Sequence, residues 1–128
     1  MARLVVETSA WAAYFRGEAH PLLDLGLESS AIAIPAMIYV ELAGHSVTGK
    51  ERAPWDRFLA ALPMAPADRD HFERAGKLKR EMESRGFSLS ARDIHVVQTA
   101  LDLKAILVTN DPIFLEARKY CDLAVEMG

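Results

Sequence analysis

The segment "LVTNDPIF" (residues 107–114) is a short apolar run that ends on a polar corner carrying one acid. Leu107 and Val108 are typical of a buried β-strand, and Pro112 suits the first turn of a new helix. Asp111 lies between them, at the point where the strand is expected to leave the sheet. Because Asn-Asp-Pro favours a turn by itself, Asp111 is either a turn residue or part of an active site. The rest of the sequence has to distinguish these two interpretations.

The length of 128 residues predicts a single domain, residues 1–128, with a substantial core. Hydrophobic residues make up 51% of the chain and charged residues 26%, which is ordinary for a globular protein and excludes a disordered one. No apolar run is long enough to span a bilayer, and we expect no secretory signal. The single cysteine excludes an intramolecular disulfide and favours a cytoplasmic location. Because the formal net charge is −3, binding to nucleic acid would require a local basic face.

Five short apolar runs are predicted to be strands, and they are nearly continuous, as in sheets covered on both faces. They are residues 3–6, 31–34, 61–65, 105–109 and 123–127. Helical patterns lie between them, at residues 9–17, 35–45, 68–86 and 90–103. Strands that alternate with helices predict a three-layer α/β/α sandwich around a small parallel sheet of four to five strands. In such sheets ligands bind beyond the carboxyl ends of the strands.

Four acids occupy positions where a solvated charge is not required. Glu7 and Asp111 follow the first and fourth predicted strands, at the same edge of a parallel sheet. Asp93 lies in the first turn of a predicted helix, where Ser90 and Asp93 match a capping box. Taken singly, these three have structural explanations as a solvated strand end, a turn residue and a helix cap. Glu41 is harder to explain, because its place on an expected apolar helix stripe makes an unpaired carboxylate costly.

Taken together, the four acids are expected to converge at one edge of the domain. Crowded carboxylates raise one another's pKa values unless a cation neutralises them. Oxygen ligands suit Mg²⁺ or Mn²⁺, and such an ion activates water and stabilises the charge that develops during phosphodiester hydrolysis. The hydroxyls of Thr8, Ser9 and Thr109 are placed to hold the carboxylates or waters, although a helix N-cap explains Ser9 equally well.

The chain resembles the PIN-domain ribonucleases, and among them the VapC-like toxins of bacterial and archaeal toxin–antitoxin pairs. The resemblance covers essentially the whole chain and rests on four segments in order, "LVVETSAWAAYFRG", "IPAMIYVEL", "LSARDIHVVQTAL" and "AILVTNDPIF". It implies a metal-dependent endoribonuclease that forms a homodimer and cleaves a structured cellular RNA, tRNA or rRNA. It also implies a cognate antitoxin that covers the acidic pocket.

The resemblance assigns roles to particular residues of this chain. The catalytic and metal-binding acids would be Glu7, Glu41, Asp93 and Asp111, holding Mg²⁺ or Mn²⁺. The supporting polar residues would be Thr8, Ser9, Thr109 and Asn110.

Two positions depart from the family pattern. The first acid is usually Asp, and the extra methylene of Glu7 moves its carboxylate about 1.5 Å further from the backbone. A displacement of roughly 1 Å in a catalytic group can cost on the order of a hundredfold in rate. Two residues after Asp111, where a further acid is common, this chain has Ile113. The alternative function is therefore a catalytically weakened PIN-fold module that still binds antitoxin or RNA.

Basic and aromatic residues have more ordinary explanations. Arg16 and Arg92 lie near the acids in sequence and are expected to contact the substrate phosphate. The basic residues of the helix at 68–86 have two interpretations, a surface that follows an RNA backbone through phosphate contacts and an ordinary solvated face. The interleaved glutamates favour the solvated face. Trp11, Tyr14 and Phe15 are expected in the core. The alternative is that exposed members of this cluster, or Trp55 with Phe58 and Leu62, form an antitoxin-binding or dimer surface. A phosphoryl-transfer receiver domain is disfavoured, because "VVETS" (5–9) supplies one acid and no lysine follows a fifth strand near this edge.

Overall fold

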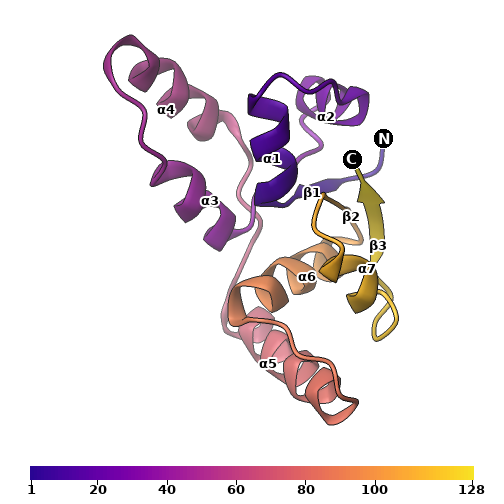
Figure 1. Ribbon diagram of the computed structural model, residues 1–128. Helices are drawn as coiled ribbons and strands as arrows, with labels where there is room; N and C mark the ends of the chain where they lie inside the picture. The colour runs from indigo at the N-terminus through magenta and orange to yellow at the C-terminus, as the bar shows by residue number, and fades with distance from the viewer.

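The computed structural model describes residues 1–128 and places three parallel strands at the centre of the molecule (Figure 1). The strands are β1 (Leu4–Val6), β2 (Ile106–Thr109) and β3 (Ala124–Met127), in the spatial order β1-β2-β3. In this register Val6 pairs with Val108, and Thr109 pairs with Met127. All of β1 is buried, and so are the last three residues of β2, as their continuous apolar sequences predict.

The predicted second and third strands continue the sheet beyond β1 as isolated bridges. Leu4 pairs with Ile32, and Ile34 pairs with Met64, both in parallel orientation. The four to five predicted strands are therefore three strands and two bridged segments. A proline directly follows Ile34 and another precedes Met64, and a proline has no N–H to extend a ladder of hydrogen bonds.

Strand β3 differs from the other two in its exposure. Ala124, Glu126 and Met127 are exposed, and Val125 is half-buried. The prediction of strands covered on both faces is right for β1 and β2 and wrong for β3. The reason is position, because β3 pairs with β2 on one side only and forms the edge of the sheet.

Seven α-helices surround the strands, and together with one short 3₁₀ turn they make up most of the regular structure. They are α1 (Thr8–Phe15), α2 (Pro21–Glu28), α3 (Ala36–Ala43), α4 (Arg52–Ala61), α5 (Arg69–Ser84), α6 (Ala91–Leu103) and α7 (Ile113–Ala117), with η1 (Gly49–Glu51) before α4. Helices α3 and α4 form an arm beside α1, and α5 packs along the outside of α6 (Figure 1). Helices α2 and α4 were not predicted. None of the helices is both long and apolar enough to cross a membrane.

The side chains of α1 and α5 correct two details of the predicted core. Trp11 is fully buried, but Phe15 is 43% exposed and lies against the aromatic rings of α4. On α5 the spacing of Phe72, Ala75, Leu78 and Met82 predicts one apolar stripe, but Phe72 is 50% exposed. The buried position in that turn belongs to His71, which hydrogen-bonds to α6. Both corrections arise because neighbouring helices, rather than the local pattern, decide which side of the turn is covered.

Candidate functional site

Glu7 is held at the carboxyl edge of the sheet by both backbone and side-chain contacts. Its N–H donates to the Val108 carbonyl at 2.9 Å, which places it beside the end of β2. Its Oε1 accepts the Ser9 N–H at 3.2 Å as the N-cap of α1, and also the Ser9 hydroxyl. The Thr109 hydroxyl donates to the same oxygen at 2.6 Å. Because Glu7 is only 4% exposed, it is not a solvated strand end.

The environment of Glu7 favours its charged form. Burial by itself raises the pKa of this carboxyl, because the charged form loses its hydration. Hydrogen bonds from Ser9, Thr109 and Arg92, together with the positive charge of Arg92, outweigh that effect and lower the pKa below its usual value. The side chain is therefore a buried carboxylate at neutral pH.

Glu41 and Asp93 reach the same region from α3 and α6. Glu41 is exposed and lies on the open face of α3, so its expected burial on an apolar stripe is wrong. The Thr8 hydroxyl donates to its Oε1 at 3.1 Å. Asp93 lies in the first turn of α6, where its N–H donates to the Ser90 hydroxyl oxygen at 3.1 Å, as the capping pattern predicts. The cap uses the backbone of Asp93 and leaves its carboxylate available to the site.

The guanidinium of Arg92 lies among these three carboxylates. Its Nε donates to Glu41 at 2.8 Å, its Nη2 donates to Glu7 at 3.0 Å, and its Nη1 donates to Asp93. Nη2 also donates to the Thr8 hydroxyl oxygen at 2.9 Å. Burial lowers the pKa of Arg92, but its hydrogen bonds to the three acids raise the pKa overall, so the side chain stays charged. Arg92 was expected to contact substrate phosphate; in the structure it is the counter-ion of the acids.

Asp111 does not hydrogen-bond directly to the other three acids. Its Oδ1 accepts the Ile113 N–H at 3.0 Å, which fits the turn that starts α7, and its own N–H donates to Thr109 Oγ1 at 3.0 Å. It is thus linked to Glu7 only through Thr109 and makes no hydrogen bond to Arg92. Asn110 donates its N–H to Ser9 Oγ at 2.8 Å, and its side chain accepts the N–H of Gly128 at 3.2 Å. Asn110 therefore fixes the corner without touching an acid.

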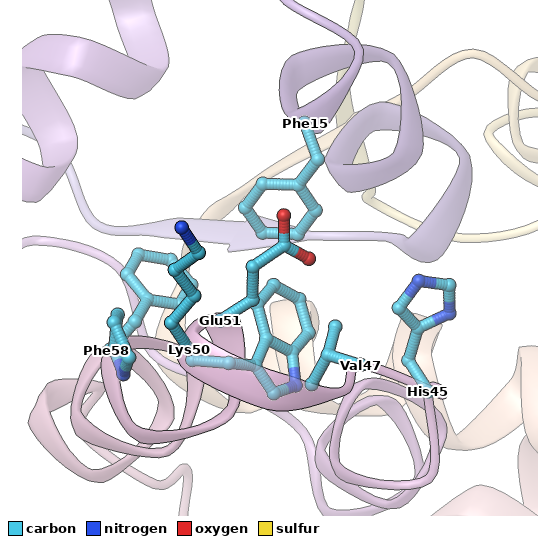
Figure 2. Close-up of a pocket in the computed structure, with 8 residues that line it drawn as sticks. Phe15, His45, Val47, Lys50, Glu51 and Phe58 are labelled. Atoms are coloured by element: carbon cyan, nitrogen blue, oxygen red, sulfur yellow. The ribbon is translucent and has the colours of Figure 1, made fainter.

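A cleft opens beside the cluster, between α1 and the α3–α4 arm. Its volume is about 380 Å³, and its walls include Thr8, Glu41 and the exposed Arg16, whose Nη2 donates to Glu18 at 3.0 Å. A second hollow has a volume of about 550 Å³. It shares the lining residues Phe15, His45 and Trp55 with this cleft. In Figure 2, Phe15 extends from one backbone segment and Lys50 and Glu51 extend from another, with the Glu51 carboxylate directed toward the Phe15 ring. The two hollows share three residues and together make up one depression with an aromatic lining, and Glu41 is the member of the acidic cluster that lines it.

The donor set suits a hard divalent cation, but the present arrangement of the acids does not enclose one. Three carboxylates and the nearby hydroxyls are the oxygen ligands that Mg²⁺ and Mn²⁺ prefer. No group of three or more His, Cys, Asp or Glu side chains is placed so that it could hold a metal ion. The guanidinium of Arg92 lies where these carboxylates would have to converge. The residue types of the site are therefore those that a divalent ion prefers, and Arg92 occupies the space between three of the carboxylates.

Sequence reasoning missed a second polar cluster, which links α5 and α6. His71 Nδ1 lies 2.7 Å from Asp102 Oδ2, and His71 Nε2 lies 2.8 Å from His95 Nδ1. Arg74 donates to Asp102 at 2.9 Å, and Lys79 pairs with Glu83 at 3.3 Å, so part of the basic face of α5 is neutralised as predicted. His71 and His95 have no metal-ligand spacing in the sequence. Their positions on apolar helix faces were the feature that could have indicated a buried polar cluster.

Comparison with protein families matches the PIN domain over residues 4–120. The chain belongs to the PIN-domain family. Solved structures with this fold include VapBC2 from Rickettsia felis bound to a promoter DNA fragment, at 22% identity, a TM-score of 0.77, and coverage of 100% of this chain and 99% of that one. DNA-bound VapBC from Salmonella typhimurium is 17% identical, with a TM-score of 0.78 over 99% and 98%. VapBC-5 from Mycobacterium tuberculosis is 21% identical, with a TM-score of 0.63 over 99% and 98%.

These likenesses confirm the PIN fold predicted from the sequence. Comparison with curated protein sequences gave no match. The roles of individual residues in this PIN domain therefore depend on its own geometry.

Proposed function

We propose that this PIN-domain protein is a ribonuclease toxin that requires a divalent metal ion, cleaves a structured cellular RNA and is neutralised by an antitoxin. The observation that carries the proposal is that Glu7, Glu41 and Asp93 all pair with the guanidinium of Arg92 at the carboxyl edge of the sheet. This is the edge at which parallel α/β sheets bind ligands. The toxin–antitoxin character is supported by the VapBC structures that share the fold.

The proposed metal ligands are the four acids predicted from the sequence, Glu7, Glu41, Asp93 and Asp111. A bound Mg²⁺ or Mn²⁺ supplies Lewis-acid stabilisation of the charge that develops on the phosphate. Ser9 and Thr109 orient Glu7 through its Oε1, and Thr8 orients Glu41. Asp111 joins the site through a rotation of its side chain away from the Ile113 N–H.

The RNA backbone is proposed to follow the cleft between α1 and the α3–α4 arm. Arg16 lies on the wall of that cleft and is placed to contact a phosphate. Glu41 is exposed on α3, on the opposite wall of the cleft, and we assign to its carboxylate the acceptance of a proton from the attacking water. A structured RNA fits this geometry better than a small nucleotide, because the depression extends well beyond the acids.

The antitoxin is proposed to cover the aromatic end of the depression. Phe15, Trp55 and Phe58 line it, and Phe15 is 43% exposed. An apolar segment of a partner seated there would also block the way to Glu41 and Arg16. A homodimer and a cytoplasmic location complete the proposal, as the resemblance to VapC-like toxins and the single cysteine suggest.

The second candidate is a catalytically weakened module that keeps the binding surfaces. It is favoured by Glu7, which stands where the family usually has Asp and whose Oε1 is occupied by three donors. It is also favoured by Arg92, which already neutralises part of the acidic cluster.

The direct test is metal-dependent cleavage of a pool of total tRNA and rRNA. We would compare the wild-type protein with Glu7→Asp, Asp93→Asn and the matched surface control Asp122→Asn, each with Mg²⁺, Mn²⁺ or EDTA. The proposal predicts cleavage by the wild type and by Asp122→Asn that EDTA abolishes and that Asp93→Asn lacks. Cleavage by Glu7→Asp alone would establish the weakened module, and no cleavage by any folded variant would contradict the nuclease.

A further inference from the structure

We propose that Arg92 is a built-in counter-cation of the acidic cluster, which a divalent metal ion must displace before the site becomes competent. The inference rests on the proposed function, because it concerns the regulation of the same site. It assigns to this chain its own means of keeping the site closed when no metal ion is bound.

Arg92 contacts several groups of the site at once. A guanidinium has five N–H donors in a fixed fork, and Arg92 uses them for four hydrogen bonds. Three of its partners are carboxylates carried by different elements, the end of β1, α3 and α6 itself. A surface arginine that pairs with one acid, such as Arg16 with Glu18, shows no such bridging. Arg92 is thus placed to hold the acids in a shared, neutralised arrangement.

The acidic cluster carries more negative charge than Arg92 neutralises. Glu7, Glu41 and Asp93 carry three negative charges, and Arg92 offsets one of them. The Glu7 side chain is 5% exposed, and a buried carboxylate without a partner is strongly destabilising. The same field that holds the guanidinium also attracts a divalent ion, so the two cations compete for one set of oxygens. Occupation by one excludes the other, because Arg92 lies between the carboxylates.

Both solvent and a neighbouring hollow are accessible to the Arg92 side chain. Its side chain is 27% exposed, so the guanidinium reaches solvent without crossing the core. A hollow of about 330 Å³ is also lined by Arg92, with Met37, Phe72 and Gly76 among its other lining residues. Rotation of the side chain toward this hollow releases Glu7, Glu41 and Asp93 together. The displaced guanidinium then lies at the rim of the site, where a phosphate of the substrate becomes its new partner.

The test is Mn²⁺ binding, measured by the loss of the free-ion EPR signal and by calorimetry. An opposite charge within about 4–6 Å changes the proton affinity of a carboxylate by about 10- to 1,000-fold, and a metal ion experiences the same field. We therefore expect Arg92→Gln to bind Mn²⁺ at least about tenfold more tightly than the wild type. Arg118→Gln is the matched control, because it removes the same charge from an exposed residue that forms no ion pair with any of the acids. It should bind Mn²⁺ like the wild type.

Thermal unfolding gives a second readout that does not depend on activity. In EDTA, Arg92→Gln should melt below the wild type because the three acids lose their counter-ion, and Mn²⁺ should raise its melting temperature more than that of the wild type. If Arg92→Gln does not fold in EDTA, Arg92→Lys tests the same point, because lysine keeps the charge but cannot bridge three acids. This variant should bind Mn²⁺ with intermediate affinity.

The outcomes separate this inference from the proposed function. Equal or weaker Mn²⁺ binding by the folded Arg92 variants would overturn the competition while leaving the metal site intact. A failure of every variant, including Glu7→Asp, to bind Mn²⁺ would overturn both the competition and the proposed metal-dependent nuclease.

Discussion

Thr109→Val tests whether the buried carboxylate of Glu7 depends on the hydroxyl at the end of β2. Thr109 is fully buried, and its hydroxyl donates to Glu7 Oε1 at 2.6 Å and accepts the Asp111 N–H at 3.0 Å. Valine has nearly the same shape but can neither donate nor accept. Hydrogen bonds to charged groups contribute about 1.5–3 kcal/mol, so we expect the free energy of unfolding to fall by about 2 kcal/mol.

Urea denaturation at neutral pH in EDTA measures this loss. With an m-value of about 1–3 kcal/mol/M, the midpoint should fall by roughly 1 M urea. Thr99→Val is the matched control, because Thr99 is also buried but its hydroxyl donates to the His95 carbonyl at 2.8 Å within α6. That carbonyl also accepts a backbone N–H in the helix, so the control should lose less than about 1 kcal/mol. Equal losses in the two variants would refute the reasoning.

The effect of Thr109→Val should also depend on pH. The pKa of Glu7 in the folded protein lies below its usual value of 4.5, because hydrogen bonds and Arg92 outweigh the effect of burial. Stabilisation by a carboxylate of this kind is complete above the unfolded pKa and is lost as the pH falls through the folded one. The difference in stability between the wild type and Thr109→Val should therefore be constant near neutral pH and shrink below pH 4.5.

Three other variants follow from the packing and charges elsewhere. Gly26→Ala should lower the free energy of unfolding by about 1–3 kcal/mol in urea, because a Cβ there would lie 2.8 Å from Leu4 Cδ1. Burial and the neighbouring histidine lower the pKa of His95 below its usual value of 6.5, so the unfolded state binds a proton first and the melting temperature should decrease as the pH is lowered through 6.5. His95→Gln should reduce that dependence and the exposed control His45→Gln should not; equal slopes would contradict this explanation. Ser90→Ala removes the N-cap of α6 and should cost about 1 kcal/mol in the same denaturation assay, and an unchanged midpoint would show that the cap is unimportant.

Local patterns predicted the inner part of the fold but not the arm. The runs at β1 and β2 are continuous and apolar because both strands are buried, so the sequence carries their signal directly. Helix α4 contains Pro54, which looks like a helix breaker but lies in the first turn, where no N–H is needed. Helix α2 is short, with Gly26 inside it, and this glycine is present because Leu4 leaves no room for a Cβ. Both helices depend on contacts that local spacing does not show.

The acids of the site were easier to predict than their partner. Glu7 and Asp93 lie at a strand end and in a first helical turn, positions that can be located from sequence alone. The pairing of Arg92 with Glu7 and Glu41 joins residues 85 and 51 positions apart, so no local pattern reveals it. Asp111 shows the opposite case, because its predicted turn role accounts for every hydrogen bond that it makes. Asp111 is therefore proposed to join the metal ligands only when the metal ion is bound.

Glu7, Glu41 and Asp93 are proposed to form a divalent metal site, and Arg92 is proposed to occupy that site when no metal ion is bound. Diffraction from crystals grown with and without MnCl₂, collected near the manganese absorption edge, tests this proposal most directly. We predict an anomalous peak between the three carboxylates, with Arg92 turned away from them when Mn²⁺ is present and between them when it is absent. A well-ordered Arg92 that keeps its contacts in saturating Mn²⁺, with no anomalous peak at the acids, would contradict the account.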